Sequence, residues 1–214
     1  MASEHHHHGG LLIIISAPSG GGKTTLCEEL LKHQPNTVRA VTCTTREPRE
    51  GEKDGIDYYF LDAGTFLKRV QAGNFLEHAT VYGNSYGTLK SEVLGKLRQG
   101  KDVLLSIDVQ GAATIRDRAE EDPELKRALL TLFLAPASLD VLEKRLLKRG
   151  KDSKQVIQKR LSVARQEIAQ AKHFDYTLIS STIPDDLKRM QSIIVAEKLR
   201  TSRAHLPDYD KQPA

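Results

Sequence analysis

The first apolar segment of the chain, Leu11-Leu-Ile-Ile-Ile-Ser16, runs directly into the glycine-rich sequence Ala17-Pro-Ser-Gly-Gly-Gly-Lys-Thr24. A continuous aliphatic run of this length is typical of a strand buried on both faces in a parallel sheet. A helical pattern follows, with leucines on one face. This order predicts an anion site, because the N–H groups of the turn and the positive end of the helix dipole point to the same place.

The glycine-rich sequence fits the pattern of a phosphate-binding loop with one departure, since Ala17 stands where that pattern has glycine. We expect Lys23 to place a point charge on the outer phosphates and the Thr24 hydroxyl to bind Mg²⁺. The alternative is a glycine-rich turn that precedes Lys-Thr by chance, and the flanking strand and helix argue against it. The candidate residues for a nucleoside triphosphate are Ala17, Pro18, Ser19, Gly20, Gly21, Gly22, Lys23, Thr24 and Thr25.

Strand-like and helical segments alternate along most of the chain. This alternation predicts a doubly wound α/β sheet with its ligand site at the carboxyl ends of the strands. Residues 44–88 break the pattern, so we interpret them as an insert at the functional edge of the sheet. The insert is expected to contain short strand-like pieces at Tyr58–Leu61 and Phe75–Val81 and one short helix near Thr65–Ala72. The expected strands are Leu11–Ser16, Val38–Cys43, Val103–Asp108, Leu129–Leu134 and Tyr176–Ser180, and the expected helices are Ala112–Glu120, Leu139–Arg149, Val156–Lys172 and Asp185–Arg200.

Composition narrows the class of protein. The 214 residues are 39% hydrophobic and 28% charged, which is enough apolar material to bury a core. A net charge of +4, 5% aromatic residues and no tryptophan give little support to nucleic-acid binding. No apolar run reaches the length of a membrane span, and the two cysteines, Cys27 and Cys43, suit a reducing compartment. We therefore expect a cytoplasmic protein without nucleic-acid or membrane partners.

Both ends of the chain are expected to lie outside the folded unit. Residues 1–10 carry His5, His6, His7 and His8 ahead of two glycines, which is typical of a purification tag or a flexible leader and not of a metal site. Residues 207–214 are interpreted as a frayed tail.

Two further segments carry charged side chains that suit phosphate chemistry. In Thr42-Cys-Thr-Thr-Arg46-Glu-Pro-Arg49-Glu-Gly-Glu52, a proline fixes the backbone between two arginines that can converge on one phosphate. Asp108 ends a predicted strand, where a carboxylate beside a phosphate loop can orient Mg²⁺ or a substrate. A carboxylate there is also often a helix N-cap, so both interpretations stay open.

Together these motifs resemble guanylate kinase from about residue 11 to about residue 200. The resemblance rests on the phosphate loop and on Thr44-Thr-Arg-Glu-Pro-Arg-Glu-Gly-Glu52, Gly83-Asn-Ser-Tyr-Gly-Thr88 and Ile107-Asp-Val-Gln-Gly111. It implies an α/β fold over residues 11–206. The implied parts are a parallel five-stranded P-loop core (residues 11–41, 92–137 and 166–206), an inserted mixed α+β GMP-binding domain (42–91) and a helical lid (138–165).

The resemblance also implies an acceptor site for GMP. A carboxylate at Glu77 would accept hydrogen bonds from guanine N1–H and the 2-amino group, which adenine does not offer, and such a site can reject the wrong base by roughly 10⁴-fold. Without the flanking motifs, Glu77 would be interpreted as an exposed strand-end charge. The implied residues are Arg46, Arg49, Tyr58 and Tyr86 for the phosphate, Thr42, Glu77, Thr88 and Asp108 for guanine, and Glu52 in the same site.

Basic residues near the end of the chain complete the predicted cleft. Arg145 and Arg149 are four residues apart and share a helix face, and the resemblance implies that they reach the phosphates together with Arg160. Lys144 and Lys148 are interpreted as a solvated face. ATP and GMP bring about six negative charges, which the arginines, a lysine and one Mg²⁺ can balance. The expected catalytic residues are Lys23, Arg46, Arg145, Arg149 and Arg160, with Arg145 and Arg149 also on ATP.

Two positions depart from the family pattern. Ser106 stands where aspartate is usual, which leaves either a weaker metal site or a greater role for Asp108. Ser180 stands where an asparagine near the donor base is usual, so an adenine contact at this position stays open.

The expected reaction is ATP + GMP (or dGMP) ⇌ ADP + GDP, by direct in-line transfer with Mg²⁺ held by Thr24 and Asp108. A guanylate-kinase-like module that binds phosphopeptides is one alternative, but it would normally lack Lys23 and the lid arginines. A sugar-phosphate kinase is another, and Glu77 with its neighbouring threonines argues against it.

Overall fold

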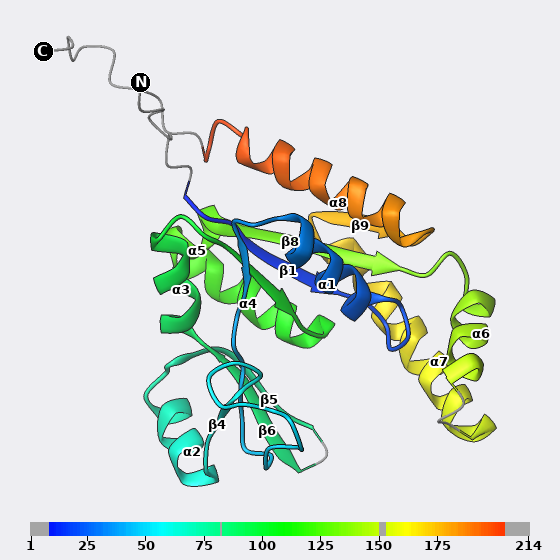
Figure 1. Cartoon of the computed structure of the whole chain (residues 1–214), viewed down its shortest axis with the longest axis horizontal. Coiled ribbons are helices and arrows are strands. Elements are labelled where there is room, and N and C mark those ends of the chain that lie inside the picture. The colour runs from blue at the N-terminus through cyan, green and yellow to red at the C-terminus, as the bar shows by residue number, and fades with distance from the viewer. Residues whose placement is uncertain (1–8, 82, 150–152, 204–214) are drawn as a thin grey trace, which may run out of the picture.

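A parallel sheet of five strands forms the centre of the molecule. The computed structural model describes residues 9–81, 83–149 and 153–203, with Arg149 described by its backbone alone, so the predictions for His5–His8 and for residues 207–214 lie outside the described residues. The strand order is β2-β7-β1-β8-β9. The strands are β1 (Leu12–Ser16), β2 (Thr37–Arg39), β7 (Asp102–Ser106), β8 (Leu129–Ala135) and β9 (Tyr176–Ile179) (Figure 1).

Helices cover both faces of this sheet. Ile13 and Ile15 pack with α1 (Lys23–His33) and α8 (Ile183–Lys198) on one face. Leu12 and Ile14 pack on the other face with the three helices α3 (Lys90–Arg98), α4 (Val109–Glu121) and α5 (Pro123–Ala128). Burial of both faces explains the unbroken apolar run of β1 and confirms the predicted α/β class.

A second, mixed sheet lies to one side of the first (Figure 1, bottom). Its order is β4-β3-β6-β5, with β3 parallel to β4 and antiparallel to β6. Helix α2 packs on it through Phe66, whose ring stacks on Phe75 at 4.6 Å between centroids. The elements are β3 (Cys43–Thr44), β4 (Tyr59–Phe60), α2 (Ala63–Gln71), β5 (Phe75–Val81) and β6 (Asn84–Leu89).

The prediction of one strand over Val38–Cys43 is wrong, because the chain passes from the first sheet to the second within this segment. The Ala40 N–H still donates to the Leu104 carbonyl of β7, at 3.0 Å. The Thr42 carbonyl already accepts from Tyr59 N–H, also at 3.0 Å. The segment therefore contributes β2 to the first sheet and, four residues later, the start of β3 to the second sheet.

Glu92, in the first turn of α3, fastens the place where the two sheets meet. One carboxylate oxygen accepts the Val41 N–H at 3.0 Å, and the other accepts the Tyr59 hydroxyl at 3.2 Å. Lys96, one turn further along α3, pairs with the same carboxylate. One side chain of the first sheet's helical layer therefore holds both the connecting segment and the second sheet.

A pair of helices projects from the carboxyl end of the first sheet (Figure 1, right). They are α6 (Leu139–Arg149) and α7 (Lys154–Ala169), and the 3₁₀ turn η1 (Gln170–His173) follows. They have an apolar cluster of their own, which includes Leu142, Leu146 and Ile157. Within the described residues, none of the helices combines the length and apolar character needed to cross a bilayer.

Candidate functional site

The glycine-rich loop follows the central strand β1, as the sequence predicts. Gly20 and Gly22 adopt φ values of +90° and +99°, which side chains other than glycine rarely tolerate. Gly22 is the N-cap of α1 and makes no side-chain capping bond, so the first N–H groups of the helix depend on another partner. The loop is therefore shaped to bind an anion through its backbone.

Lys23 lies in the first turn of α1 and crosses to the neighbouring strand end. Its ammonium donates to the Ile107 carbonyl at 2.9 Å. Burial lowers the pKa of Lys23, while the nearby charges of Asp108 and Glu167 act in the opposite direction. Ser16, at the end of β1, also donates to the Ile107 carbonyl. The loop after β1 and the end of β7 are thus joined at the predicted phosphate site.

Asp108 does not end a strand, because β7 stops at Ser106. Instead Asp108 is the N-cap of α4, and its Oδ1 accepts the Gly111 N–H at 2.8 Å. Of the two interpretations that the sequence left open, the capping one is present in the structure. The residue is exposed, and its carboxylate also lies close enough to Glu77 and Lys23 to act on their pKa values.

Arg46 is held in a preformed arrangement on the second sheet. Its guanidinium donates to both oxygens of Glu52, each at 2.9 Å, and to the Glu47 carbonyl at 2.6 Å. It also lies 5.5 Å from the centroid of the Tyr58 ring. Glu52 additionally accepts the Arg49 N–H, so one carboxylate organises both arginine positions.

Tyr58 and Tyr86 lie beside this arginine. Their rings meet edge to face at 6.3 Å between centroids. Arg49 is exposed, whereas Arg46 is only partly exposed. A phosphate bound here would meet cationic and phenolic groups from β6 and from the segment between β3 and β4.

Glu77 is buried in the second sheet, with 7% of its surface exposed. It faces Thr88 across the β5–β6 ladder, and the Thr88 hydroxyl donates to its Oε1 at 2.8 Å. Burial raises the pKa of the Glu77 carboxyl, and the Thr88 hydrogen bond opposes that rise. A Cβ at Gly111 would lie 3.4 Å from Glu77 Oε2, so the carboxylate is directed toward the start of α4.

The projecting helices bring arginines back to the phosphate loop. Arg145 of α6 donates to the Gly21 carbonyl at 3.2 Å and to the Ser180 hydroxyl at 3.4 Å. Arg160 of α7 donates to the Ser19 hydroxyl at 3.0 Å. The side chain of Arg149 lies outside what the structure describes. Two of the three predicted lid arginines therefore contact the loop that carries Lys23.

One charged side chain of this cluster escaped sequence reasoning. Glu167 of α7 interacts electrostatically with Lys23 and Asp108, and burial raises the pKa of its carboxyl. Its spacing from Arg160, seven residues or about two helical turns, places both on one face of α7. The spacing could have linked Glu167 to Arg160 from the sequence alone. It points to the site only once this face of α7 is known to contact the phosphate loop.

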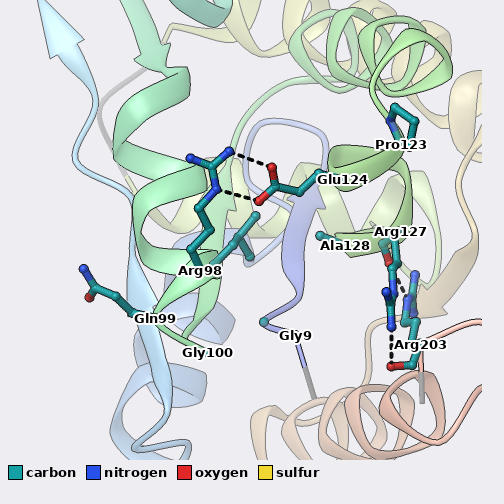
Figure 2. Close-up of a pocket in the computed structure, with 11 residues that line it drawn as sticks. Gly9, Arg98, Gln99, Gly100, Pro123, Glu124, Arg127, Ala128 and Arg203 are labelled. Carbon is teal, nitrogen blue, oxygen red and sulfur yellow. Dashed lines mark hydrogen bonds and ion pairs between the residues drawn. The ribbon is translucent and has the colours of Figure 1, made fainter. Parts of the chain in front are cut away.

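A cavity of about 660 Å³ lies at the opposite edge of the first sheet, away from these residues (Figure 2). Its arginines are engaged within the protein. Arg98 pairs with Glu124, and the guanidinium groups of Arg127 and Arg203 donate to each other's backbone carbonyls. None of the predicted site residues whose side chains the structure describes lines this cavity, so we place the candidate site at the carboxyl edge of the sheet.

Comparison with known proteins gives matches over most of the chain. A family model described as guanylate kinase matches residues 10–197. The guanylate kinase of Carboxydothermus hydrogenoformans is 39% identical over 183 residues, which are 86% of each chain. That of Hahella chejuensis is 44% identical over 180 residues, 84% of this chain and 83% of its own. The crystal structure of guanylate kinase from Anaplasma phagocytophilum aligns with a TM-score of 0.71 at 30% identity, covering 92% of this chain and 90% of that one.

Proposed function

This chain belongs to the guanylate kinase family, and on that premise we propose how its residues carry out the transfer of the γ-phosphoryl group of ATP to GMP. It is an ATP-dependent nucleoside monophosphate kinase.

Glu77 reads the acceptor base in this proposal. One oxygen is oriented by Thr88, and the other is directed toward the start of α4. A buried carboxylate gains most from a partner that donates hydrogen bonds, and guanine offers N1–H and the 2-amino group. Adenine would leave this carboxylate unpaired, which is the physical basis for selecting GMP. Thr88 supplies a hydroxyl group beside it, and we propose Thr42 as a further hydroxyl contact to the base.

Arg46, Arg49, Tyr58 and Tyr86 hold the phosphate of GMP. The Arg46–Glu52 pair supports this role, because Glu52 fixes the planar guanidinium before the substrate arrives. No residue of this proposed set is assigned to the ribose 2′-hydroxyl, so dGMP is expected to serve as an acceptor as well.

The phosphate loop and the lid hold ATP and the group in transfer. Residues 17–25 bind the phosphates through their backbone N–H groups, except at Pro18, which has none, and Lys23 neutralises the outer phosphates. Arg145, Arg149 and Arg160 add positive charge between donor and acceptor. Phosphoryl transfer depends mainly on position and charge neutralisation, so direct in-line transfer needs no covalent intermediate from the protein.

Magnesium fits the residues present. Among the described residues no group of three His, Cys, Asp or Glu side chains forms a preformed cage. Mg²⁺ bound with nucleotides typically takes one or two protein oxygens and completes its shell with phosphates and water. We propose the exposed Thr24 hydroxyl and the Asp108 carboxylate as those oxygens. Bound there, Mg²⁺ supplies positive charge against the phosphates.

The buried carboxylate of Glu77, poised opposite Thr88, carries the proposal. A coupled ADP-release assay with GMP, dGMP, AMP, UMP and a sugar bisphosphate tests it. We expect turnover with the guanine nucleotides and little with the others, and equal rates for GMP and AMP would overturn the assignment. A phosphopeptide-binding module would instead show no turnover, and the presence of Lys23, Arg145 and Arg160 argues against it.

The free, buried thiols of Cys27 and Cys43 support a reducing cytoplasm as the place of action. The reaction needs two small nucleotides, and we propose no nucleic-acid partner.

A further inference from the structure

A cavity of about 500 Å³ lies between the phosphate loop and the start of α8. Residues lining it include Gly22, Thr25, Arg145, Ser180 and Asp186. In the sheet order, Asp108 follows β7 on one side of the central strand, whereas Ser180 follows β9 on the other side. With GMP on the side of β7 and ATP phosphates on the central loop, this cavity is left for the nucleoside of ATP.

Asp186 is the unexplained group in this cavity. Its side chain is 1% exposed, yet it is a carboxylate in the first turn of α8. Oδ1 accepts the Ser181 N–H at 3.0 Å and the Ser181 hydroxyl at 3.4 Å. Oδ2 is buried and has no hydrogen-bond partner among the described residues. Burying such an oxygen without a donor is costly, and native proteins seldom do so without a reason.

A role in stabilising the start of α8 explains the contacts of Asp186 Oδ1 but not the burial of Oδ2. Acidic groups favour the first turn of a helix, and Oδ1 accepts the N–H of Ser181, which immediately precedes the N-cap Thr182. The neighbouring Asp185 already serves the same end of α8 from an exposed position, accepting the Thr182 hydroxyl at 2.8 Å. Neither role requires Oδ2 to be buried beside a cavity.

The donors that ATP could offer to Oδ2 are few. Its phosphates are acceptors and would repel a carboxylate, which leaves the 6-amino group of adenine and the ribose hydroxyls. Ser180 is already engaged by Arg145. Guanine carries an oxygen at C6, which would face a carboxylate unfavourably at this position.

We propose that Asp186 is a specificity residue for the phosphoryl donor, accepting through Oδ2 a hydrogen bond from the 6-amino group of adenine. This inference rests on the proposed placement of ATP on the phosphate loop. It makes Asp186 the donor-side counterpart of Glu77, with a different base edge recognised by each carboxylate.

The test compares ATP with purine riboside 5′-triphosphate, which carries hydrogen in place of the 6-amino group. The wild-type protein should show a KM for the analogue roughly tenfold to a hundredfold above that for ATP, the size expected for one hydrogen bond to a charged group. Asp186→Ala should raise the KM for ATP and abolish the difference between the two nucleotides, with the KM for GMP unchanged. Asp185→Ala, one residue away, is the control and should behave as wild type.

The proposal is overturned if Asp186→Ala keeps the full difference between ATP and the analogue. It is also overturned if the variant instead abolishes a difference between ATP and 2′-deoxy- or 3′-deoxy-ATP, because the partner would then be a ribose hydroxyl. If Asp186→Ala fails to fold, Asp186→Asn is measured in the same comparison and must reduce the difference. Lys23→Ala tests the placement of ATP independently of Asp186: an unchanged rate in that variant refutes the placement, whereas a negative result at Asp186 leaves the Lys23 effect intact.

Discussion

The proposed acceptor-base pocket and the proposed phosphate clamp are built from different kinds of structure. Glu77 and Thr88 are directly opposed on two hydrogen-bonded strands, so their geometry is part of a ladder. Arg145 and Arg160 reach the phosphate loop as long side chains from two projecting helices. A strand pair holds groups at a fixed spacing, whereas contacts between helices and a loop can be made and broken. Choice of base and transfer of phosphate should therefore be separable by mutation.

Removing the buried carboxylate should give an effect as large as any predicted below, and the quantity that changes should be the selectivity for the acceptor base. Glu77→Ala should lower the preference for GMP over AMP, measured as the ratio of kcat/KM values, from roughly 10⁴ to about tenfold. The reason is that the unpaired carboxylate no longer penalises adenine. Glu121→Gln, an exposed acid at the end of α4, is the matched control. A ratio unchanged in Glu77→Ala would mean that the base is read elsewhere.

Removing the positive charge of Lys23 should lower the rate of transfer and leave the selectivity for GMP unchanged. Lys23→Ala should lower kcat by about 10³-fold, because it removes a charge aimed at the phosphates. The GMP-to-AMP ratio should stay as in the wild type. Thermal unfolding should occur at an equal or higher temperature, since burial disfavours the charged lysine in the folded state. Lys32→Ala, at an exposed lysine of α1 paired with Glu29, should leave kcat unchanged.

A lid arginine should have a smaller effect on the same quantity. Arg160→Ala should lower kcat by roughly 10²-fold, less than the 10³–10⁵ of a sole arginine finger, because three arginines share the charge. The KM for GMP should change little. Arg165→Ala, from an exposed position on the same helix, is the control. A large rise in the KM for GMP would show that α7 belongs to the acceptor pocket and would blur the contrast between the two regions.

The smallest predicted effect is the pH dependence that arises from Glu77, a few-fold change in the KM for GMP. Burial raises its pKa, and the ionised form is the one that accepts hydrogen bonds from guanine. The KM for GMP should therefore rise as the pH falls through that raised pKa. Thr88→Val removes a hydrogen bond that lowers the pKa, so the rise should begin at a higher pH. A pH profile identical to wild type would separate Thr88 from the titration.

The same shift predicts the sign of a stability change. Between the ordinary pKa of a glutamate and the raised pKa of Glu77, the folded protein binds more protons than the unfolded chain. The free energy of unfolding should thus fall as the pH rises through this window. Glu77→Gln should remove that dependence, as measured by thermal unfolding without nucleotide across the pH range.

The central sheet could be predicted because its signals are local. A continuous apolar strand, a glycine-rich turn and an amphipathic helix can be recognised within fewer than 25 residues of sequence. The structure has β1 and α1 in that order. Segment 75–81 was found as a strand with the observed bounds. The partner strand β6 was missed, because Asn84-Ser-Tyr-Gly-Thr-Leu89 lacks alternation of apolar and polar residues and owes its place to pairing with β5.

The site divides in the same way. Residues of the phosphate loop could be named from spacing, and Glu77 from its resemblance to a family motif. The partners of these residues could not be found, since the contacts of Lys23 with Ile107 and of Arg145 with Ser180 join segments 84 and 35 positions apart. Glu167 and Asp186 are ordinary helical acids in the sequence, and burial by distant segments makes them unusual.

Glu92 has a consequence for how the two sheets could move relative to each other. Since its two oxygens accept the Val41 N–H and the Tyr59 hydroxyl, any rotation of the second sheet relative to the first would be centred near this carboxylate. How far Arg46 and Glu77 would move in such a rotation depends on their distance from the Glu92 side chain of α3. Glu92→Asp would weaken this junction between the two sheets while leaving the proposed substrate contacts in place.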